Sequence, residues 1–357
     1  MSGPLLKDRY ELAVIGAGPA GMAAAITAAE IGIDTVILDE QPTPGGQIYR
    51  AIGETPLRDP AILGAAYWKG APLVETFHAS AAQYVPEATV WTASADGEIG
   101  VSVGGSVRML KVKRIILATG ALERPFPIQG WTLPGVMTAG AAQILLKSAA
   151  MVGAGRVVLA GTGPLLWLIA AQYLRAGGAL TTILETTPRA NLGRALPFLP
   201  GFLRSSYLRE GFELVTEVRR RTNLVRSVIA LRAGGTDRLT NVTYRTGAGL
   251  EVTVRADTLL LHQGVVPNVN LALALGCKHA WNETQLCFAP ALDAWGQSSV
   301  AMVAIAGDGA GIAGAVAAEQ RGHLAALGAA FQLGHVDEVT RDRMAAEHLP
   351  ALRDAQL

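Results

Sequence analysis

Three glycines near the N-terminus have the spacing of a dinucleotide-binding turn. Gly16 permits a tight turn, Gly18 lets the backbone approach a diphosphate, and Gly21 lets the following helix pack closely on the preceding strand. The N–H groups at the start of that helix would face the diphosphate. The residues of the turn are Gly16, Ala17, Gly18, Pro19, Ala20 and Gly21.

The elements around this turn fit the same purpose. An apolar run at 12–15 suits a buried strand, and a second expected strand at 34–38 ends at Asp39 and Glu40. An acid about 20 residues after the glycines can accept hydrogen bonds from ribose hydroxyls. Asp39 has the better spacing, and Glu40 is the alternative. Strand, turn, helix and acid in register predict an adenine-dinucleotide site; the alternative is a glycine-rich helix start in an unrelated α/β protein.

Three further segments place glycines where a flat cofactor could approach. Residues 41–50, QPTPGGQIYR, contain two prolines and a glycine pair, so the chain must turn sharply there. Residues 115–125 form an apolar strand that runs into Ala118-Thr119-Gly120. Residues 303–314 form another strand, which ends at Gly307-Asp308 before a helix. Because Asp is favoured at helix N-caps, capping is a second role open to this residue.

Together these segments resemble the FAD domain of the two-dinucleotide-domain flavoproteins, the superfamily of thioredoxin reductase and the ferredoxin reductases. The segments WTLPGVM at 131–137 and HQGVVPN at 262–268 are more specifically similar to one branch. That branch is the FAD-binding alpha subunit of heteromeric amino-acid and imino-acid dehydrogenases, such as opine oxidases, hydrogen cyanide synthase and D-hydroxyproline dehydrogenase. The resemblance covers residues 9–335 and implies an α/β fold of two Rossmann-like domains, the second inserted in the first, with small β-meanders.

The resemblance also implies which residues bind FAD. It places the glycines of the first turn and Asp39 on the ADP half, Gly46 and Gln47 beside the flavin, and Asp308 near the ribityl or pyrophosphate region. The complete expected set is Gly16, Gly18, Pro19, Ala20, Gly21, Asp39, Glu40, Gln41, Gly45, Gly46, Gln47, Ala118, Thr119, Gly120, Gly307 and Asp308.

Residues 156–166 repeat the strand and glycine turn in the middle of the chain, and an acid-ended strand follows. Leu166 occupies the third glycine position, where its bulk would push helix and sheet apart. The acid of this second candidate would repel a 2′-phosphate, so NAD is favoured over NADP. Arg189 and Arg194 could meet phosphates or stay solvated. The expected second-site residues are Gly161, Gly163, Pro164 and Glu185.

Three interpretations of this second site are open. It is an intact nicotinamide (NAD) site, a site for an adenine nucleotide such as ATP, or a vestigial structural domain. The landmarks divide the chain into an FAD domain at 1–123 and 270–335 and an inserted domain at 124–269, with β-meanders expected over 75–113 and 225–261. Residues 336–357 are charged and amphipathic, as in a terminal helix that packs on a partner or in a solvated tail.

Composition limits the function classes. The chain has 357 residues, half of them apolar, which suffices for two domains with buried cores. Its net charge of +1 and the absence of a basic run argue against nucleic-acid binding. Cys277 and Cys287 are isolated, so neither a disulfide framework nor a metal site is expected, and reduced thiols of a cytoplasmic protein are favoured.

One uncharged stretch, residues 157–174, has the length of a membrane span. The turn residues at 161–164 divide it into a strand and a buried helix, so no membrane span is expected. The N-terminal apolar run is the first strand itself, and a secretory signal is not expected either.

Absent residue pairs constrain the chemistry further. Disulfide reduction in this superfamily uses two cysteines a few residues apart beside the flavin, and this chain has no such pair. None of the six histidines is expected to pair with an acid at general-base spacing, and His262 is interpreted as a core or hinge histidine. The sequence therefore leaves the catalytic residues unknown.

The resemblance implies the FAD-binding alpha subunit of a hetero-oligomeric dehydrogenase for an amino or imino acid of the D-hydroxyproline, proline or opine type. A catalytic beta subunit with its own flavin would oxidise the small-molecule substrate, and this subunit would relay electrons. A small iron–sulfur subunit is a second expected partner. The alternatives are a self-sufficient NADH-dependent reductase of ferredoxin-reductase type and a structural or nucleotide-sensing subunit.

Overall fold

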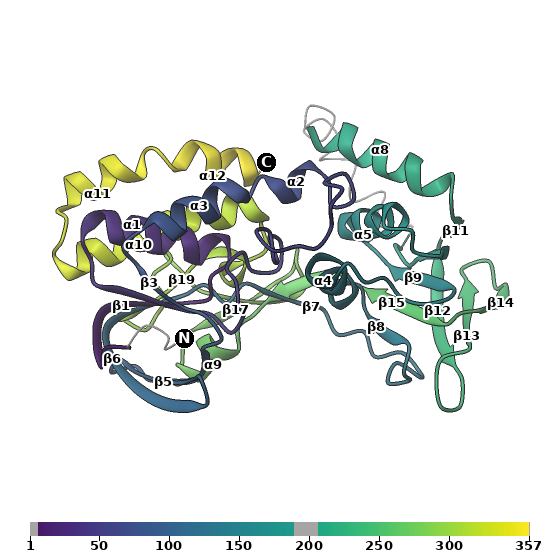
Figure 1. The fold of residues 1–357 in the computed structure, drawn as a ribbon, viewed down its shortest axis with the longest axis horizontal. Helices are drawn as coiled ribbons and strands as arrows, with labels where there is room; N and C mark the ends of the chain where they lie inside the picture. The colour runs from purple at the N-terminus through teal and green to yellow at the C-terminus, as the bar shows by residue number, and fades with distance from the viewer. Residues whose placement is uncertain (1–5, 189–205, 357) are drawn as a thin grey trace. The chain divides into compact units, whose positions relative to one another are not determined.

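The computed structural model describes residues 6–188 and 206–356 (Figure 1). Arg189 and Arg194 lie outside the described residues. The chain divides into two compact units. The first contains Met1–Gly53, Tyr67–Leu122 and Val265–Leu357, and the second contains Glu54–Ala66 and Glu123–Gly264.

The first unit is built on a parallel sheet with the strand order β3-β2-β1-β6-β19. Its central strands are apolar on both faces, which is typical of a parallel sheet covered on both sides. The strands are β1 (Arg9–Ile15), β2 (Thr35–Leu38), β3 (Gln83–Val85), β6 (Ser106–Leu117) and β19 (Val303–Ile305). This is the Rossmann-like arrangement that the sequence predicts.

Two helices lie side by side on this sheet: α1 (Pro19–Ile31) and α10 (Ala315–Leu333) (Figure 1). Pro at the first position of α1 favours helix initiation, and Gly32 ends the helix in the left-handed conformation. The two helices approach closely, because a Cβ on Gly322 of α10 would lie only 2.1 Å from the carbonyl oxygen of Ala20 in α1. Small residues therefore bring α10 against the first turn of α1.

An antiparallel meander extends the same sheet through β4 (Thr89–Ala93), β5 (Glu98–Val103) and the first half of β6. The meander predicted over 75–113 begins later than expected, because α3 (Ala71–Ala79) is a helix. Buried Val74 and Phe77 lie one turn apart on α3, and this helical spacing outweighs the β-branched residues nearby. Further short elements are α2 (Ala65–Trp68), α9 (Asn270–Ala274), β17 (His279–Asn282), β18 (Cys287–Pro290) and η2 (Gly307–Ala310).

The segment after Gly334 forms two helices, α11 (Glu338–Ala345) and α12 (Leu349–Gln356), which pack along α10. The guanidinium carbon of Arg341 in α11 lies 4.2 Å from the centroid of Trp295 and 4.6 Å from that of Phe331. Such cation–π contacts are attractive, and here they join α11 to the body of the first unit.

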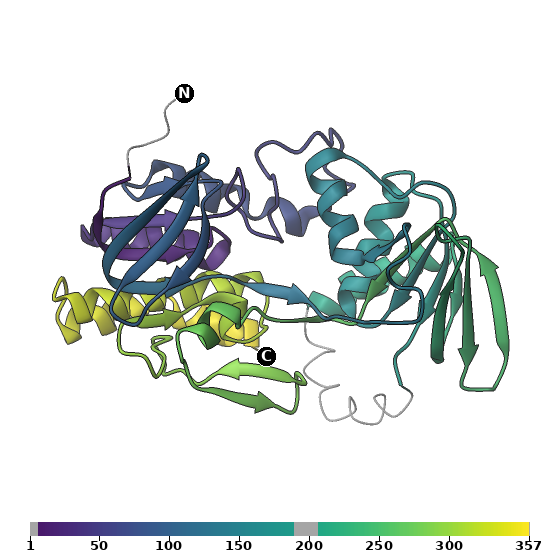
Figure 2. The ribbon, with the colours of Figure 1, turned by 90° about the horizontal axis from the view of Figure 1, so that it is seen from below.

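The second unit repeats the parallel plan with the strand order β11-β10-β9-β15-β8. Figure 2 shows its separate antiparallel sheet of β12, β13 and β14, drawn in green. The parallel strands are β8 (Val136–Thr138), β9 (Val157–Gly161), β10 (Leu180–Glu185), β11 (Asn223–Val225) and β15 (Thr258–His262). The other elements are α4 (Ala139–Ala149), α5 (Pro164–Arg175), α8 (Ser206–Arg219), β12 (Val228–Gly234), β13 (Asn241–Thr246) and β14 (Glu251–Arg255).

The uncharged stretch at 157–174 is divided into β9 and α5, as its turn residues predict. Within the described ranges, no helix has the length and apolar character needed to cross a membrane. Two short strands, β7 (Ala121–Glu123) and β16 (Val265–Pro267), pair with each other where the chain leaves and re-enters the first unit. The fold is thus α/β, with two Rossmann-like domains and two meanders.

Candidate functional site

The first glycine turn is packed too tightly for side chains. Gly16 has a φ of +103°, and a Cβ there would lie 2.5 Å from the carbonyl oxygen of Ala118. A Cβ on Gly21 would lie 1.8 Å from the carbonyl oxygen of Gly16. The strand, the turn and the start of α1 therefore need glycine at both positions, and the turn rests against the ATG segment.

The glycine-pair loop folds back onto the same turn. The N–H of Gly45 donates to the carbonyl of Ala17 at 2.8 Å. A Cβ on Gly46, whose φ is +61°, would lie 2.8 Å from the Cα of Gly18. The loop therefore closes one side of the space in front of α1, although Gln47 itself is exposed.

The remaining two segments complete the arrangement. A Cβ on Gly307, with a φ of +71°, would lie 2.7 Å from the Cβ of Ala20 in α1. A Cβ on Gly309 would lie 3.5 Å from the carbonyl oxygen of Gly120. The hydroxyl of Thr119 donates to the carbonyl of Asn268 at 3.1 Å. All four motifs thus meet at the carboxyl ends of the parallel strands, the usual location of ligand sites in such sheets.

Asp308 holds the segment before α10 but does not cap the helix, whose N-cap is Gly314 with no side-chain cap. Its Oδ1 accepts hydrogen bonds from the N–H groups of Ala313 at 3.1 Å and Gly314 at 3.3 Å, immediately before α10. Arg321 of α10 donates to the carbonyl oxygens of Gly307 at 3.4 Å and Gly311 at 2.6 Å. Burial lowers the pKa of Arg321, and the nearby Asp308 opposes that shift. This pair of side chains fixes the backbone of the GD segment.

The two adjacent acids at the end of β2 differ in what they contact. Asp39 is 7% exposed, and its carboxylate accepts from the N–H of Ala17 and, at 2.7 Å, from the N–H of Gln41. Burial raises the pKa of Asp39. Glu40 is exposed, and its carboxylate accepts from the side-chain amide of Gln41 at 3.1 Å. Asp39 therefore holds the turn, and Glu40 has more freedom to accept from a ribose.

The second glycine turn has a different construction. A Cβ on Gly161 would lie 1.7 Å from the carbonyl oxygen of His262, so this glycine serves the contact with β15. Gly163 has a φ of +90° and borders open space, and Pro164 begins α5. Leu166, at the third glycine position, is completely buried. A leucine is thus accommodated where the first turn requires glycine.

The acid of this second turn already has protein partners. The Oε1 of Glu185 accepts from the hydroxyl of Thr187 at 3.4 Å, and its Oε2 lies 3.4 Å from the Nε of Arg226. The hydroxyls of Thr187 and Thr162 are 2.7 Å apart, which joins this acid to the glycine turn itself. A ribose would have to compete with these contacts.

The prediction that no histidine pairs with an acid was wrong. Nδ1 of His262, at the end of β15, lies 2.6 Å from Oε1 of Glu123, and the other carboxylate oxygen accepts from the N–H of Gly140 at 2.7 Å. His262 is 2% exposed. The two residues are 139 positions apart, so only the pairing of distant segments brings them together. His335 also contacts an acid, with its Nε2 3.1 Å from Glu11.

The site residues that the sequence predicts do not include Arg50, Glu123 or Arg321. Glu123 closely follows the ATG segment and Arg50 ends the segment QPTPGGQIYR, so both lie inside the predicted motifs. The signal that could have indicated Arg50 is a charged residue at the end of the segment expected to turn sharply. Arg321 carries no local signal, because its partners are backbone carbonyls in another segment.

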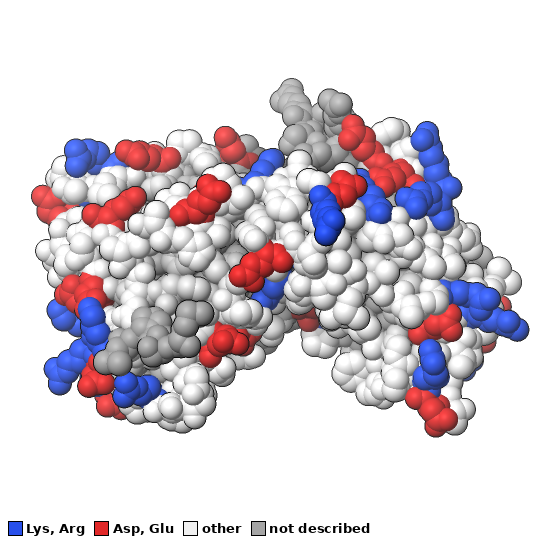
Figure 3. All heavy atoms as spheres, viewed as in Figure 1, with Lys and Arg blue, Asp and Glu red and all other residues white. Residues whose placement is uncertain are grey.

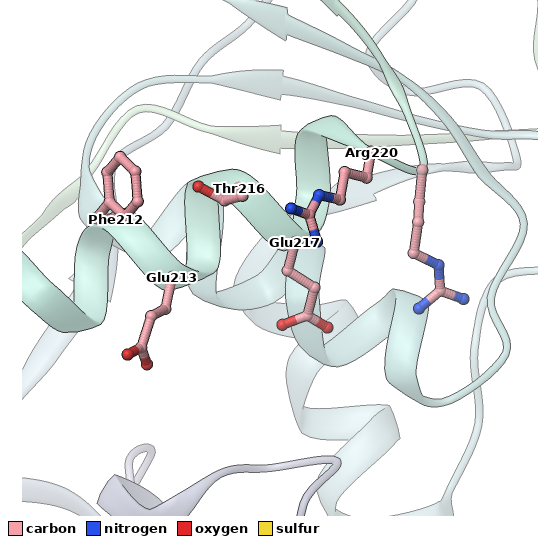
Figure 4. A pocket seen from close by; sticks show the side chains of 6 residues that line it. Phe212, Glu213, Thr216, Glu217 and Arg220 are labelled. Atoms are coloured by element: carbon pink, nitrogen blue, oxygen red, sulfur yellow. The ribbon is translucent and has the colours of Figure 1, made fainter.

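The described residues give little support for a metal site, a charged binding surface or a site in the surface pocket. Within the described part of the chain, no group of three His, Cys, Asp or Glu side chains could hold a metal ion. On the face drawn in Figure 3, acidic and basic side chains alternate over the surface. A surface pocket along α8 contains none of the predicted site residues (Figure 4). Its lining consists of Phe212, Glu213, Thr216, Glu217, Arg220 and Arg221.

Known proteins place this fold and turn chemistry in a family. The model of the pyridine nucleotide-disulphide oxidoreductases matches residues 10–322. The chain belongs to this family. It is 47% identical to an opine oxidase subunit of Agrobacterium tumefaciens (strain Ach5) over 94% of this chain and 68% of that protein. It is 44% identical to the corresponding opine oxidase subunit of Rhizobium meliloti over 93% of this chain and 64% of that protein.

A more distant relative is hydrogen cyanide synthase subunit HcnB of Pseudomonas aeruginosa, which is 34% identical over 89% of this chain and 70% of that protein. The chain therefore spans about two thirds of the length of these relatives. Among solved structures, L-proline dehydrogenase from P. horikoshii aligns with a TM-score of 0.68 at 16% identity, over 95% of this chain and 59% of that one. T. acidophilum thioredoxin reductase aligns with a TM-score of 0.65 at 20% identity, over 90% of this chain and 97% of that one. These likenesses show the two-domain fold.

The chain is thus an FAD-dependent oxidoreductase of this family, and its first unit fits the cofactor. Glycines stand where a Cβ would fill the turn, the N-terminus of α1 has no side-chain cap that would compete with a diphosphate, and an exposed acid follows β2. When bound, FAD supplies the electron-accepting ring, while the protein binds and orients it. The assignment of individual residues to FAD stays a prediction.

Proposed function

We propose that this chain is the FAD-binding alpha subunit of a hetero-oligomeric amino-acid or imino-acid dehydrogenase. In this proposal a partner beta subunit oxidises the C–N bond of a substrate of the D-hydroxyproline, proline or opine type, and this chain relays the electrons through FAD. The observation that carries it is the identity of 47% and 44% to two opine oxidase subunits, over more than nine tenths of this chain.

The cysteine content supports a role other than disulfide reduction. The chain has only Cys277 and Cys287, and both are buried free thiols. Disulfide exchange needs one thiolate that attacks and a second that resolves the mixed disulfide. Buried cysteines without a neighbouring partner thiol do not supply this chemistry.

The construction of the second turn supports a relay over a self-sufficient NADH-dependent reductase. Leu166 replaces the glycine that permits close helix packing, and Glu185 already has Thr187 and Arg226 as partners. Both features oppose the ordinary binding of a nicotinamide dinucleotide. An adenine nucleotide in the second unit and a vestigial second site are the remaining alternatives.

The first experiment measures the absorbance of the purified chain between about 350 and 500 nm, before and after anaerobic addition of NADH, followed by acid release of every bound nucleotide. The expected result is bound FAD that NADH does not bleach. Prompt bleaching by NADH would instead support the self-sufficient reductase. A chain that binds FAD without reversible bleaching by any reductant would support the structural or nucleotide-sensing role.

A second experiment tests the need for a partner. The isolated chain should oxidise proline, hydroxyproline and opines at negligible rates, and turnover of any of them by the chain alone at enzyme-like rates would refute the relay. Co-purification should recover a catalytic beta flavoprotein subunit, and a small iron–sulfur subunit is a further expected partner. The cytoplasmic location indicated by the cysteine content stays a prediction.

A further inference from the structure

Arg50 is a buried cation at the end of the glycine-pair loop. The residue is 7% exposed. The hydroxyl of Tyr67 donates to its backbone carbonyl at 2.7 Å, and its Nη2 donates to Oε1 of Gln47 at 3.3 Å. The Nε–H of Arg50 has no hydrogen-bond partner among the described residues. A buried donor without an acceptor is unfavourable, so this group points to a missing partner.

The loop that carries Arg50 is fixed to the first glycine turn. Its start is joined to the turn by the hydrogen bond from Gly45 to Ala17, at 2.8 Å. The N–H of Tyr49 then donates to the carbonyl of Gly45 at 3.1 Å, so the loop closes on itself. A Cβ on Gly70 would lie 2.3 Å from the ring of Tyr49, which shows how closely the next segment covers the loop. Arg50 therefore cannot move far from the dinucleotide turn.

The charges around Arg50 belong to the end of β2. Burial lowers the pKa of Arg50, and the carboxylates of Asp39 and Glu40 oppose that shift. Asp39 in turn is affected by the charge of Arg50. The guanidinium thus lies within electrostatic range of the two acids at the expected ribose position. Because a guanidinium stays charged in proteins, its unpaired N–H needs an oxygen acceptor.

We propose that Arg50 binds the ADP half of FAD directly and that its Nε–H donates to an oxygen of that half. This inference rests on the proposed FAD site. The acceptor is an oxygen of the adenosine-side phosphate or of the adenosine ribose, both of which are acceptors for a guanidinium. The neighbouring acids balance the buried charge when the cofactor is absent.

The test compares Arg50→Lys and Arg50→Met with the wild-type chain, using FAD, ADP and FMN as probes and flavin fluorescence or calorimetry as the readout. Lysine keeps the charge but loses the fixed fork of N–H donors, and methionine keeps much of the volume without the charge. Both variants should bind FAD and ADP roughly 10- to 100-fold more weakly, the usual loss for a charge-assisted hydrogen bond. FMN binding should stay unchanged, since FMN contains neither the adenosine-side phosphate nor the adenosine ribose.

Arg114 provides a matched control. It is a second arginine of the first unit whose Nε has no partner among the described residues, and its Nη1 donates to the carbonyl of Ala301 at 2.5 Å. It lies within β6, three residues before the strand ends. Arg114→Lys should leave the affinities for FAD and ADP unchanged.

Each possible result either supports or refutes the proposed contact between Arg50 and FAD. If both Arg50 variants bind ADP as tightly as the wild type, the proposed contact does not exist. If FAD, ADP and FMN weaken by the same factor, Arg50 only supports the fold, and the inference also fails. Adenosine as a further probe separates the two acceptors, because a loss with ADP but not with adenosine identifies the adenosine-side phosphate, and a loss with both identifies the ribose. If the wild-type chain binds no FAD, the proposed function fails before Arg50 is tested.

Discussion

The two units of this chain contain the same strand, glycine turn and acid-ended strand, but they use the third turn position differently. In the first unit, a Cβ at Gly21 would lie 1.8 Å from the carbonyl oxygen of Gly16. In the second unit, Leu166 occupies the equivalent position and is fully buried. The first helix therefore starts against its strand, whereas the second has room for a leucine between them. Closeness of helix and strand, more than the presence of two glycines, distinguishes the turns.

The acids that follow the two turns also differ in whether the protein already provides their partners. Glu40 is exposed at the end of β2, while Glu185 at the end of β10 contacts Thr187 and Arg226. Because a buried or paired carboxylate must lose its partners before it can bind a ribose, the second acid is less suited to that task. One turn is thus open to a ligand, and the other is partly satisfied by the protein.

The largest effect is expected when Gly21 of the first turn is replaced by leucine, the residue at the equivalent position of the second turn. Gly21→Leu should destabilise the first unit by more than about 4 kcal/mol and abolish FAD binding, because the side chain would meet the backbone of Gly16. Denaturant unfolding and the flavin content of the purified chain measure both effects. Gly211→Leu is the control, since a Cβ there meets nothing within 4 Å. A Gly21→Leu variant that folds and retains FAD would contradict the distinction between the turns.

The second turn should lose stability when its leucine is shortened. Leu166→Ala is expected to cost about 2 to 5 kcal/mol in the free energy of unfolding, because it leaves a cavity in a fully buried position. The FAD content should not change. Leu145→Ala, at a position that is 40% exposed in the same unit, should cost much less. Equal losses from the two substitutions would show that Leu166 does not fill the space between helix and sheet.

A substitution at Gly18 should weaken FAD binding without impairing folding. A Cβ there would lie 3.7 Å from the Cα of Gly46, an ordinary contact, so Gly18→Ala should fold normally. The methyl group would stand where the diphosphate must approach, and FAD affinity should fall by about 1 to 3 kcal/mol, as for a lost charge-assisted hydrogen bond. Gly163→Ala in the second turn should leave FAD affinity unchanged. Loss of FAD affinity only in Gly163→Ala would reverse the assignment of the two turns.

The two acids at the end of β2 can be distinguished by FAD titration. Glu40→Gln should weaken FAD binding by about 1.5 kcal/mol, because an amide is a poorer acceptor for ribose hydroxyls than a carboxylate. Glu185→Gln should have no effect on FAD. If Asp39→Asn weakens binding without changing the unfolding free energy while Glu40→Gln does not, the ribose ligand is Asp39.

The smallest effect concerns acid stability of the first unit. His323 stacks on His348 with ring centroids 4.2 Å apart, and burial lowers the pKa of His323 to about 4 from an ordinary value of 6.5. His323 therefore binds a proton at a higher pH in the unfolded chain than in the folded chain. The contribution of this histidine to the free energy of unfolding is present above pH 6.5 and is lost as the pH falls toward 4. The expected loss is about 1 kcal/mol at pH 5.5.

Urea unfolding at pH 7.5 and pH 5.5 measures this loss. His323→Gln should reduce the difference between the two pH values. His78→Gln, at an exposed position of the same unit, should keep it. An unchanged pH difference in the His323 variant would show that other groups cause the acid sensitivity.

The sequence predicts a structural feature well where that feature depends on residues close together in the chain. Glycine spacing predicts the first turn, and turn residues correctly divide the apolar stretch at 157–174 into β9 and α5. The prediction fails where the interacting residues are far apart in the sequence. Glu123 and His262 are 139 residues apart, so no spacing between neighbours indicates their pair. The start of the meander expected over 75–113 is instead a local error of the prediction, since Val74 and Phe77 of the helix α3 have helical spacing.

By itself, the sequence determines the α/β class, the two repeated strand-and-turn units and the presence of acids after their second strands, since these depend on periodicity and on the conformational freedom of glycine. Tertiary structure alone decides which acid is exposed. Asp39 is drawn inward by the N–H of Ala17, which leaves Glu40 exposed, and Glu185 is paired by Arg226. It also decides that Arg50 is buried with an unpaired donor, because burial and hydrogen bonding depend on segments that only folding brings together.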